Sequence, residues 1–413
     1  MEPVLILVVI AVIAGFYLAF NIGANDVANT MGTSVGSQAM SIKQAIVLAA
    51  ICEFLGALLI GDEVSRTIKQ GFVSPTIFAA DPYGFALGMT GAILATSLWL
   101  QFATFRGLPV STTHSIVGAV LGFAIMRGGW GEINFSQLGA IFSSWLISPI
   151  LGGIIAFLCL RFILRFIIDS NDPIGRSKKI VPFMIGSAVI ILSSAFTPKL
   201  IKKVLDNYVG VWGIIASILL GLLVAFIFHI LIEKISPSSN RRDELLILTE
   251  KIFAKMQFVT ACFLAFAHGS NDVANAIGPA SAVISALVDN SVNKETHVPL
   301  WLLLVGGVGI VIGLAIFGRK VIQTVGKNIT EITPTRGFAA EFSAALTILL
   351  GTILGLPLST THVLVGAVIG VGFARGIGGI DVLVIKRIAR SWIVTMPVTA
   401  VISMIFCFFL QRI

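Results

Sequence analysis

The sequence is dominated by apolar runs that are each long enough to cross a lipid bilayer. A spanning helix needs about 20 mostly apolar residues, and the bilayer core leaves the backbone to satisfy its own hydrogen bonds. Hydrophobic residues make up 56% of the chain and charged residues only 12%, whereas a soluble domain has about 25% charged residues. We therefore predict an all-α membrane protein. Spanning helices are expected near residues 4–22, 43–60, 84–105, 138–165, 181–196, 209–232, 252–268, 299–317, 337–355 and 387–411.

Two further segments, 108–126 and 357–374, are apolar but interrupted by Gly, Pro, Ser and Thr. They are typical of broken helices or hairpins within the membrane, so the prediction is about ten spanning helices plus two such segments, about twelve in all. The polar stretch 236–250 predicts a short cytoplasmic linker. It separates a first repeat half with additional helices, 1–235, from a second repeat half, 251–413.

Two motifs occur twice and in the same order. Gly-Ala-Asn-Asp-Val-Ala-Asn at 23–29 matches Gly-Ser-Asn-Asp-Val-Ala-Asn at 269–275. Gly-Leu-Pro-Val-Ser-Thr-Thr-His at 107–114 matches Gly-Leu-Pro-Leu-Ser-Thr-Thr-His at 355–362. The copies of Asn25 lie 246 positions apart and those of Ser111 lie 248 apart, which indicates an internal duplication.

The distribution of basic residues predicts how the chain is oriented in the plasma membrane. If the N-terminus is outside, most of the 28 lysines and arginines fall in inner loops, as the positive-inside rule requires. The same rule explains the net charge of +8 without a nucleic-acid partner. In this orientation the two halves cross the membrane in opposite directions, so we expect inverted-topology repeats with both termini outside.

The Asn-Asp motifs place carboxylates at membrane depth, directly after apolar runs. A charge there costs at least about 2.5–3.5 kcal/mol on insertion scales and needs a partner or a water-filled cavity. Helix capping is an alternative, because Asn and Asp are good N-caps, but it does not explain two buried carboxylates in duplicate. Their hard oxygens suit Na⁺ or another hard cation. The predicted coupling-ion ligands in these motifs are Asn25, Asp26, Asn29, Asn271, Asp272 and Asn275.

The Pro-x-Ser-Thr-Thr-His motifs predict helix N-termini that hold an anion. Proline suits the first helical turn, and the residues after it add hydroxyls to the free N–H groups and partial positive charge of a helix start. The alternative is that these hydroxyls bond to their own backbone or permit close helix packing. Two such N-termini from inverted repeats, converging near the midplane, would hold one tetrahedral oxyanion. The predicted phosphate ligands are Ser111, Thr112, Thr113, Ser359, Thr360 and Thr361.

Several polar residues outside these sets also lie within apolar runs. His114 and His362 end the two Ser-Thr-Thr-His motifs and are candidate accessory residues, as donors, proton relays or loop-orienting groups. Glu53 and Glu341 do not align in the repeat, so we expect distinct roles, each as a coupling-ion ligand or as the partner of a buried polar group. His268 has no repeat partner, because the equivalent residue in the first half is isoleucine.

The sequence does not favour catalysis or a bound cofactor. Ser111 and His114 have a spacing that would suit an intramembrane enzyme, but no third group is evident to orient the imidazole. The four cysteines lie far apart within apolar runs and have neither metal-ligand nor disulfide spacing. We predict that the protein is not an enzyme and uses no cofactor beyond a coupling ion.

The duplicated Gly-x-Asn-Asp-Val-Ala-Asn and Gly-Leu-Pro-x-Ser-Thr-Thr-His motifs make the chain resemble the inorganic phosphate transporter (PiT) family over essentially its whole length. The resemblance implies secondary transport of phosphate coupled to Na⁺, or to H⁺ in some members. It implies that residues 111–113 and 359–361 match the substrate-binding hairpins. The large loop of animal members is missing, which indicates a prokaryotic-type sodium/phosphate symporter. By the same resemblance, the acidic positions needed for transport are Asp26, Glu53, Asp272 and Glu341.

These observations predict a secondary active transporter that imports inorganic phosphate by Na⁺ symport with alternating access. Its expected partners are phosphate, Na⁺ and the bilayer, and a homodimer is plausible for a carrier of this size. A proton-coupled carrier of metal–phosphate complexes, or a sulfate permease, would have almost the same sequence features. A passive anion channel is a further alternative, against which the paired acidic motifs argue.

Overall fold

In the part of the chain that the computed structural model describes, ten helices are long and apolar enough to cross a membrane, as the sequence predicted. The structure describes residues 2–70, 78, 80–106, 110–204, 211–237, 241–290, 292, 298–328, 332–376 and 382–410. These residues are almost entirely helical and include no strand. In chain order the helices are α1 (Glu2–Asn25), α2 (Val27–Gly36), α3 (Ile42–Ile60), α4 (Asp62–Gln70), α5 (Pro82–Arg106), α6 (Thr112–Gly128), α7 (Phe135–Ile163), α8 (Pro173–Ser194), α9 (Thr197–Val204), α10 (Val211–Glu233), α11 (Arg242–Val288), α12 (Leu300–Asn328), α13 (Pro334–Ile353), α14 (Thr360–Arg375) and α15 (Val382–Leu410).

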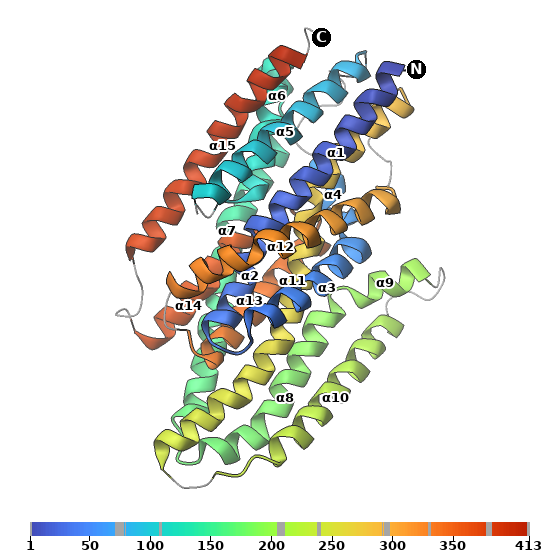
Figure 1. The fold of residues 1–413 in the computed structure, drawn as a ribbon. Helices are drawn as coiled ribbons and strands as arrows, with labels where there is room; N and C mark the ends of the chain where they lie inside the picture. The colour runs from blue at the N-terminus through green and yellow to red at the C-terminus, as the bar shows by residue number, and fades with distance from the viewer. Residues whose placement is uncertain are drawn as a thin grey trace.

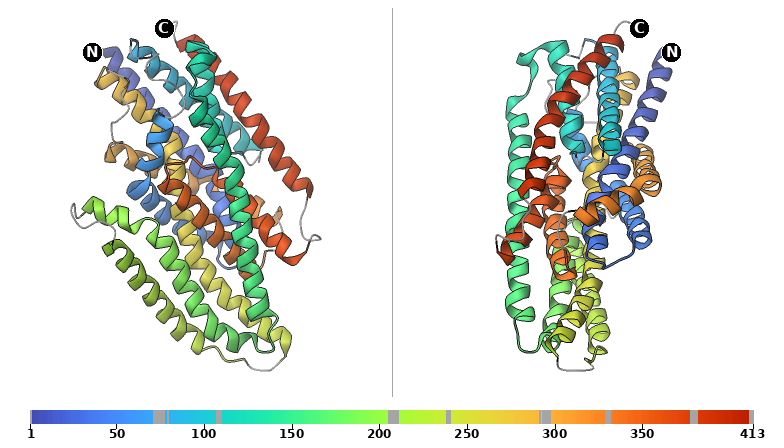
Figure 2. Two further views of the ribbon diagram at one scale, coloured as in Figure 1. Left: turned by 180° about the vertical axis from the view of Figure 1, so that it is seen from behind. Right: turned by 60° about the vertical axis from the view of Figure 1, so that its left-hand side comes forward.

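The helices that carry the two Asn-Asp motifs, α1 and α11, run in opposite directions. Both chain termini lie at one end of the molecule; α1 starts there, whereas α11 starts at the opposite end and runs toward the termini (Figure 1). Helices α8 and α10 pack on each other and lie near the end where α11 begins (Figures 1 and 2). This arrangement agrees with the predicted inverted direction of the motif helices.

The interrupted segments become short helices that follow an extended stretch. α6 begins at Thr112 and α14 at Thr360, and each packs against the long helix before it, α5 or α13. Ser111 and Ser359 cap these two helices, because each side chain accepts a hydrogen bond from a backbone N–H three residues later. The residues before α6 at 107–109 lie outside the described part of the chain.

The two halves interlock through exchanged helix pairs. α1 of the first half packs on α12 of the second, and α11 of the second packs on α3 of the first. Glycines bring the backbones together at both crossings. A Cβ at Gly23 would strike the backbone of Ile310, and a Cβ at Gly269 would strike the backbone of Glu53. The same exchange recurs where α6 packs on α15 and α14 packs on α7.

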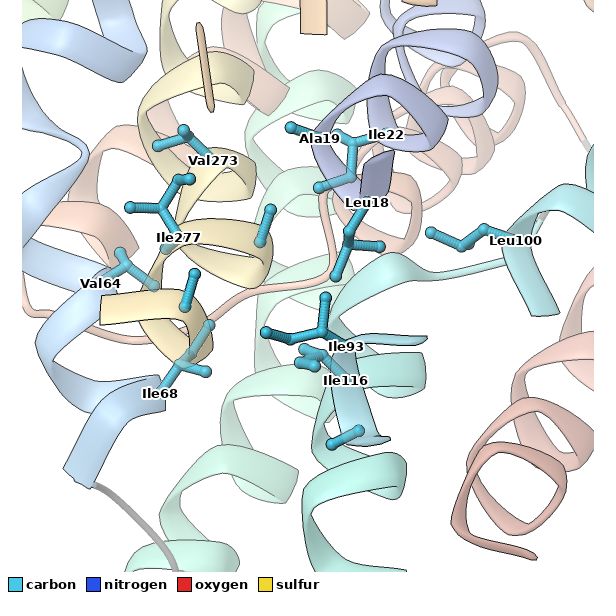
Figure 3. Close-up of a cluster of buried hydrophobic side chains, with 14 of the residues drawn as sticks. Leu18, Ala19, Ile22, Val64, Ile68, Ile93, Leu100, Ile116, Val273 and Ile277 are labelled. Atoms are coloured by element: carbon cyan, nitrogen blue, oxygen red, sulfur yellow. The ribbon is translucent and has the colours of Figure 1, made fainter. Parts of the chain in front are cut away.

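The membrane core between α1, α11 and α5–α6 is filled by small and branched apolar side chains. Figure 3 shows part of this cluster, in which Leu18 and Ile22 of α1 lie across from Val273 and Ile277 of α11. All four side chains are fully buried. By contrast, α10 presents most of its leucines, isoleucines and phenylalanines outward, as a lipid-facing helix does.

Two local features differ from the sequence-based prediction. α11 already begins at Arg242, whose guanidinium donates to the carbonyls of Ile168 (3.1 Å) and Ser170 (3.3 Å), so the non-helical linker is shorter than 236–250. The two copies of the Asn-Asp motif, which are equivalent in sequence, differ in local structure, because Asp26 stands between α1 and α2. The second copy lies inside the continuous helix α11.

Candidate functional site

The two motif carboxylates meet although they lie 246 positions apart. Ligand atoms of Asp26, His268 and Asp272 all lie within 4.8 Å of one another, and all three residues are buried. The interlocked halves produce this meeting, because α1 and α11 pack against each other at the centre of the fold. A pair of buried carboxylates at such close range calls for positive charge between them.

Each Asp accepts a hydrogen bond from the Ser-Thr-Thr motif of its own half. Thr112 Oγ1 donates to Asp26 Oδ2, and Thr360 Oγ1 donates to Asp272 Oδ2 over 2.9 Å. The second oxygen of each carboxylate, Oδ1, is buried with no hydrogen-bond partner among the described residues. Each carboxylate is therefore oriented through one oxygen and keeps the other available.

The neighbouring asparagines are anchored in the same symmetric way. Asn25 Nδ2 donates to Thr104 Oγ1 on α5 (2.7 Å), and Asn271 Nδ2 donates to Thr352 Oγ1 on α13 (3.1 Å). Thr104 and Thr352 are 248 positions apart, the same offset as the Ser-Thr-Thr motifs. These threonines orient the amides, and the sequence-based prediction did not include them.

The buried side-chain oxygens that accept no hydrogen bond at this site are suitable ligands for a hard monovalent cation. The side-chain carbonyls of Asn271 and Asn275, like Oδ1 of Asp26 and of Asp272, are buried and have no hydrogen-bond partner among the described residues. An unpartnered buried oxygen costs free energy, which a cation ligand would recover. The side chain of the predicted ligand Asn29 lies outside the described residues.

The two Ser-Thr-Thr-His motifs also meet, at the first turns of α6 and α14. The rings of His114 and His362 lie edge to face with centroids 4.4 Å apart. Thr113 Oγ1 donates to the carbonyl of Leu358 (2.8 Å), and Asn275 Nδ2 donates to that same Thr113 oxygen (3.2 Å). Each contact joins one half to the other, so the sequence-predicted convergence of the two helix starts is present.

A tryptophan packs against the place where the two motifs come together. Trp145 of α7 lies against His114, with ring centroids 3.8 Å apart, and its Nε1 donates to the carbonyl of Pro357 over 2.9 Å. Nothing in the local sequence marked Trp145, because it lies 212 positions from the residue that it contacts. The predicted phosphate ligands and both motif histidines are all buried, so the structure shields them from bulk solvent.

The other two deep carboxylates occupy different surroundings. Glu53 Oε1 lies 3.2 Å from His268 Nδ1, and His268 Nε2 lies 2.9 Å from Asp272 Oδ2, so Glu53 reaches the motif cluster through the imidazole. Glu341 is not in that cluster. Its oxygens accept four hydrogen bonds, from Thr33 (2.7 Å), Ser34 (2.5 Å), Gln257 (2.8 Å) and Thr260 (3.0 Å).

The pair His268–Asp272 has no counterpart in the first motif copy. The two residues are four apart on α11, a spacing at which oppositely charged or hydrogen-bonding side chains stabilise a helix. In the first half Ile22 stands four residues before Asp26 and offers no such contact. Asp26 itself keeps helical dihedral angles, and its N–H donates to the Ile22 carbonyl over 2.9 Å, so α2 continues almost directly from α1.

A family model described as the phosphate transporter family matches residues 22–403. The chain belongs to this family. A relative from Chlamydia pneumoniae that bears the name phosphate permease is 44% identical, over 98% of each chain. Similarly named relatives from Pyrococcus horikoshii and Haemophilus influenzae are each 42% identical over at least 96% of each chain. A solved structure, titled as the sodium-dependent phosphate transporter, is 40% identical with a TM-score of 0.91, covering 98% of this chain and 99% of that one.

Membership of the phosphate transporter family confirms three sequence-based predictions. The protein is a multi-pass membrane protein, a phosphate transporter and not an enzyme. The family explains why a buried site is built from two motif copies, since many transporters place substrate between internal repeats at mid-membrane. The choice of coupling ion and the roles of individual residues are addressed below.

Proposed function

We propose that this protein imports inorganic phosphate by symport with Na⁺ through alternating access. The proposal is supported mainly by the hydrogen bonds between the two motif types, in which Thr112 donates to Asp26 and Thr360 donates to Asp272. A cation at the unpartnered carboxylate oxygens would lie beside the helix starts proposed to hold the anion. Coupling then has a physical cause, because neither ion is cheap to dehydrate without the other.

In this proposal the anion is bound at the first turns of α6 and α14. The first N–H groups of a helix lack intrahelical partners and carry partial positive charge, which suits a phosphate oxygen. The hydroxyls of Thr112 and Thr360 already donate to the two carboxylates. The main donors that remain for phosphate are therefore the serine hydroxyls and the backbone N–H groups of residues 111–113 and 359–361. Thr113 and Thr361 belong to the proposed phosphate set through their backbone N–H groups, since Thr113 Oγ1 already donates to the Leu358 carbonyl.

The proposed cation ligands form one group for each Asn-Asp motif. The first group is Asn25 and Asp26, with Asn29 carried over from the motif, and the second is Asn271, Asp272 and Asn275. Na⁺ as the coupling ion is supported by the similar solved structure, whose title names a sodium-dependent transporter. Burial of every described member of both sets supports alternating access, because an occluded site exchanges its ligands only after the helices around it move.

The proposed orientation places both termini outside and the end formed by α7, α8, α10 and α11 in the cytoplasm. That end carries a concentration of basic residues, which favours the cytoplasmic side. They include Arg161, Arg165, Arg176, Lys178, Lys179, Lys234, Arg241, Arg242, Lys251 and Lys255.

Purified protein in proteoliposomes tests the proposed function. Uptake of radiolabelled phosphate should exceed the equilibrium level only when an inward Na⁺ gradient is present, and an equal K⁺ gradient should not replace it. Excess sulfate should not compete. Uphill uptake driven by a proton gradient alone would favour the proton-coupled alternative, and uptake that never exceeds equilibrium would favour a channel.

A further inference from the structure

The two copies of the internal duplication differ at one buried contact beside the motif carboxylates. Gly23 and Gly269 are equivalent, 246 positions apart, and their backbones meet Ile310 and Glu53 respectively. One turn further along the same crossings, Gly313 meets the backbone of Phe20 as Gly56 meets that of Phe266. The α1–α12 crossing therefore repeats the α11–α3 crossing, with Ile310 in the place of Glu53.

The same comparison pairs Ile22 with His268. Both precede the motif aspartate by four residues, and both are fully buried. The α1–α12 crossing thus has two isoleucines, Ile22 and Ile310, in one apolar cluster where the α11–α3 crossing has the ion pair Glu53–His268. Figure 3 shows Ile22 among apolar neighbours on α1. An ion pair retained at only one of two equivalent buried places is an asymmetry with a strong electrostatic effect.

This asymmetry gives Asp272 more polar neighbours than Asp26 has. Its Oδ2 accepts a hydrogen bond from Thr360 Oγ1 over 2.9 Å and lies 2.9 Å from His268 Nε2, and Glu53 Oε1 lies 3.2 Å from Nδ1 on the far side of the imidazole. Asp26 also lies within 4.8 Å of His268, but its described side-chain hydrogen bond comes from Thr112, and no ion pair at 4.0 Å or less joins it to the imidazole among the described contacts. A carboxylate locked by a second layer of hydrogen-bonding groups is preorganised for a cation, and losing that layer typically weakens metal binding.

We infer that Glu53 and His268 are positioning residues for Asp272, so that the two Asn-Asp motifs provide unequal cation sites and the second-half site is the tighter one. This inference rests on the proposed Na⁺ symport. It assigns Glu53 an indirect role: it holds the imidazole and does not itself contact the ion. The unequal sites then favour an order of loading, in which the first Na⁺ binds at Asp272 and the second binds beside Asp26.

The deciding variant makes the two helix crossings alike: Glu53→Ile together with His268→Ile copies the isoleucine pair of the α1–α12 crossing. The double change removes both charges, so no lone buried charge remains, whereas His268→Ile alone leaves Glu53 buried without its partner. We expect the double variant to insert and to melt at a higher temperature than His268→Ile alone. Equal melting temperatures of the two variants would contradict the pairing of Glu53 with His268.

The functional readout separates positioning from general damage. In proteoliposomes the Na⁺ concentration for half-maximal phosphate uptake should rise about 10- to 100-fold in the double variant, while the phosphate KM at saturating Na⁺ stays as in the wild type. A matched control, Ile22→Leu with Ile310→Leu, alters the equivalent layer without polar groups and should leave the Na⁺ dependence unchanged.

Direct binding gives a second, transport-free test. Radioactive sodium bound to the purified wild-type protein without phosphate should show two affinities, and the double variant should lose the tighter one. If the double variant fails to insert, His268→Gln replaces it: one amide cannot bridge both carboxylates, so the half-maximal Na⁺ concentration should still rise severalfold.

Wild-type Na⁺ dependence in the double variant, or in His268→Gln where that variant replaces it, would overturn the inference and leave the proposed symport standing. An absence of Na⁺ dependence in the wild-type protein itself would instead overturn the proposed function.

Discussion

Thr360 Oγ1 donates a hydrogen bond to Asp272 Oδ2 over 2.9 Å, and Thr112 makes the equivalent bond to Asp26. Each bond joins a helix start proposed to bind phosphate to a carboxylate proposed to bind a cation. The four residues come from motifs that are 86 or 88 positions apart in the sequence. This short connection makes the threonine hydroxyls the first place to test coupling between the two ions.

Thr360→Val should weaken coupling while keeping the shape of the side chain. The lost bond to a charged group is worth about 1.5–3 kcal/mol, so the Na⁺ concentration for half-maximal uptake should rise by about tenfold or more. Thr360→Ser keeps a hydroxyl and serves as the control. The hypothesis fails if the valine variant shows the Na⁺ dependence of the serine variant.

Asp26→Asn and Asp272→Asn should each reduce Na⁺-driven phosphate uptake strongly without preventing membrane insertion. An amide keeps the size of the carboxylate but removes the charge that offsets a cation. Uptake into proteoliposomes and the amount of protein in the membrane fraction measure the two effects separately. Normal Na⁺-driven uptake by both variants would exclude these aspartates as coupling-ion ligands.

Removing a donor from Glu341 should lower stability. Ser34→Ala or Thr260→Val takes one of four hydrogen bonds from a fully buried carboxylate, at a cost of about 1.5–3 kcal/mol. Thermal unfolding of the detergent-solubilised protein should show a lower midpoint. Ser343→Ala on the same helix as Glu341 is the matched control, because its hydroxyl bonds only the backbone of Ala339 among its described contacts. An unfolding midpoint of Ser34→Ala equal to that of the control would show that the network contributes nothing measurable.

Trp145→Phe should raise the phosphate KM more than it changes Na⁺ dependence. The change removes the Nε1 donor from the Pro357 carbonyl, which lies just before the α14 helix start. An unpaired buried carbonyl costs about 1–3 kcal/mol and loosens the proposed phosphate-binding turn. Trp99→Phe is the control, since Trp99 Nε1 has no hydrogen-bond partner among the described residues. Matching kinetics in the two variants would remove Trp145 from the site.

Cysteine labelling tests the orientation. Ser236→Cys lies at the basic end of the fold and Gly131→Cys lies between α6 and α7 near the termini, and both positions are exposed. In intact cells a membrane-impermeant maleimide should label position 131 only, and position 236 should react only after the cells are opened. Labelling of position 236 from outside would reverse the proposed topology.

Most of the fold and the motif residues of the site follow from local sequence. The spans of α3, α5 and α10 were predicted within two residues at each end, because length and hydropathy alone determine a membrane helix. The motif repeats located Asp26 and Asp272 and the two helix starts. Glu341 was expected to be a coupling-ion ligand or the partner of a buried polar group, and the structure surrounds it with hydrogen-bond donors from α2 and α11, which favours the second role.

The residues that the sequence did not identify share one property: their roles depend on contacts between distant helices. Thr104 and Thr352 are visible as a repeat only once the asparagines are known to bond them. Trp145 and Gln257 carry no motif. A closer comparison of the halves could have found the two threonines, since their offset equals that of the Ser-Thr-Thr motifs.

By itself the sequence determined the membrane class, the helix number, the duplication and the identity of the motif residues, because hydropathy and repeated motifs are properties of short segments. Only the tertiary structure decided that Asp26 and Asp272 face one another, that each is tied to the helix start of its own half, and that Glu53 acts on Asp272 through His268. Those relationships arise from the crossings of α1 with α12 and of α11 with α3, where glycines let backbones meet across hundreds of residues of chain.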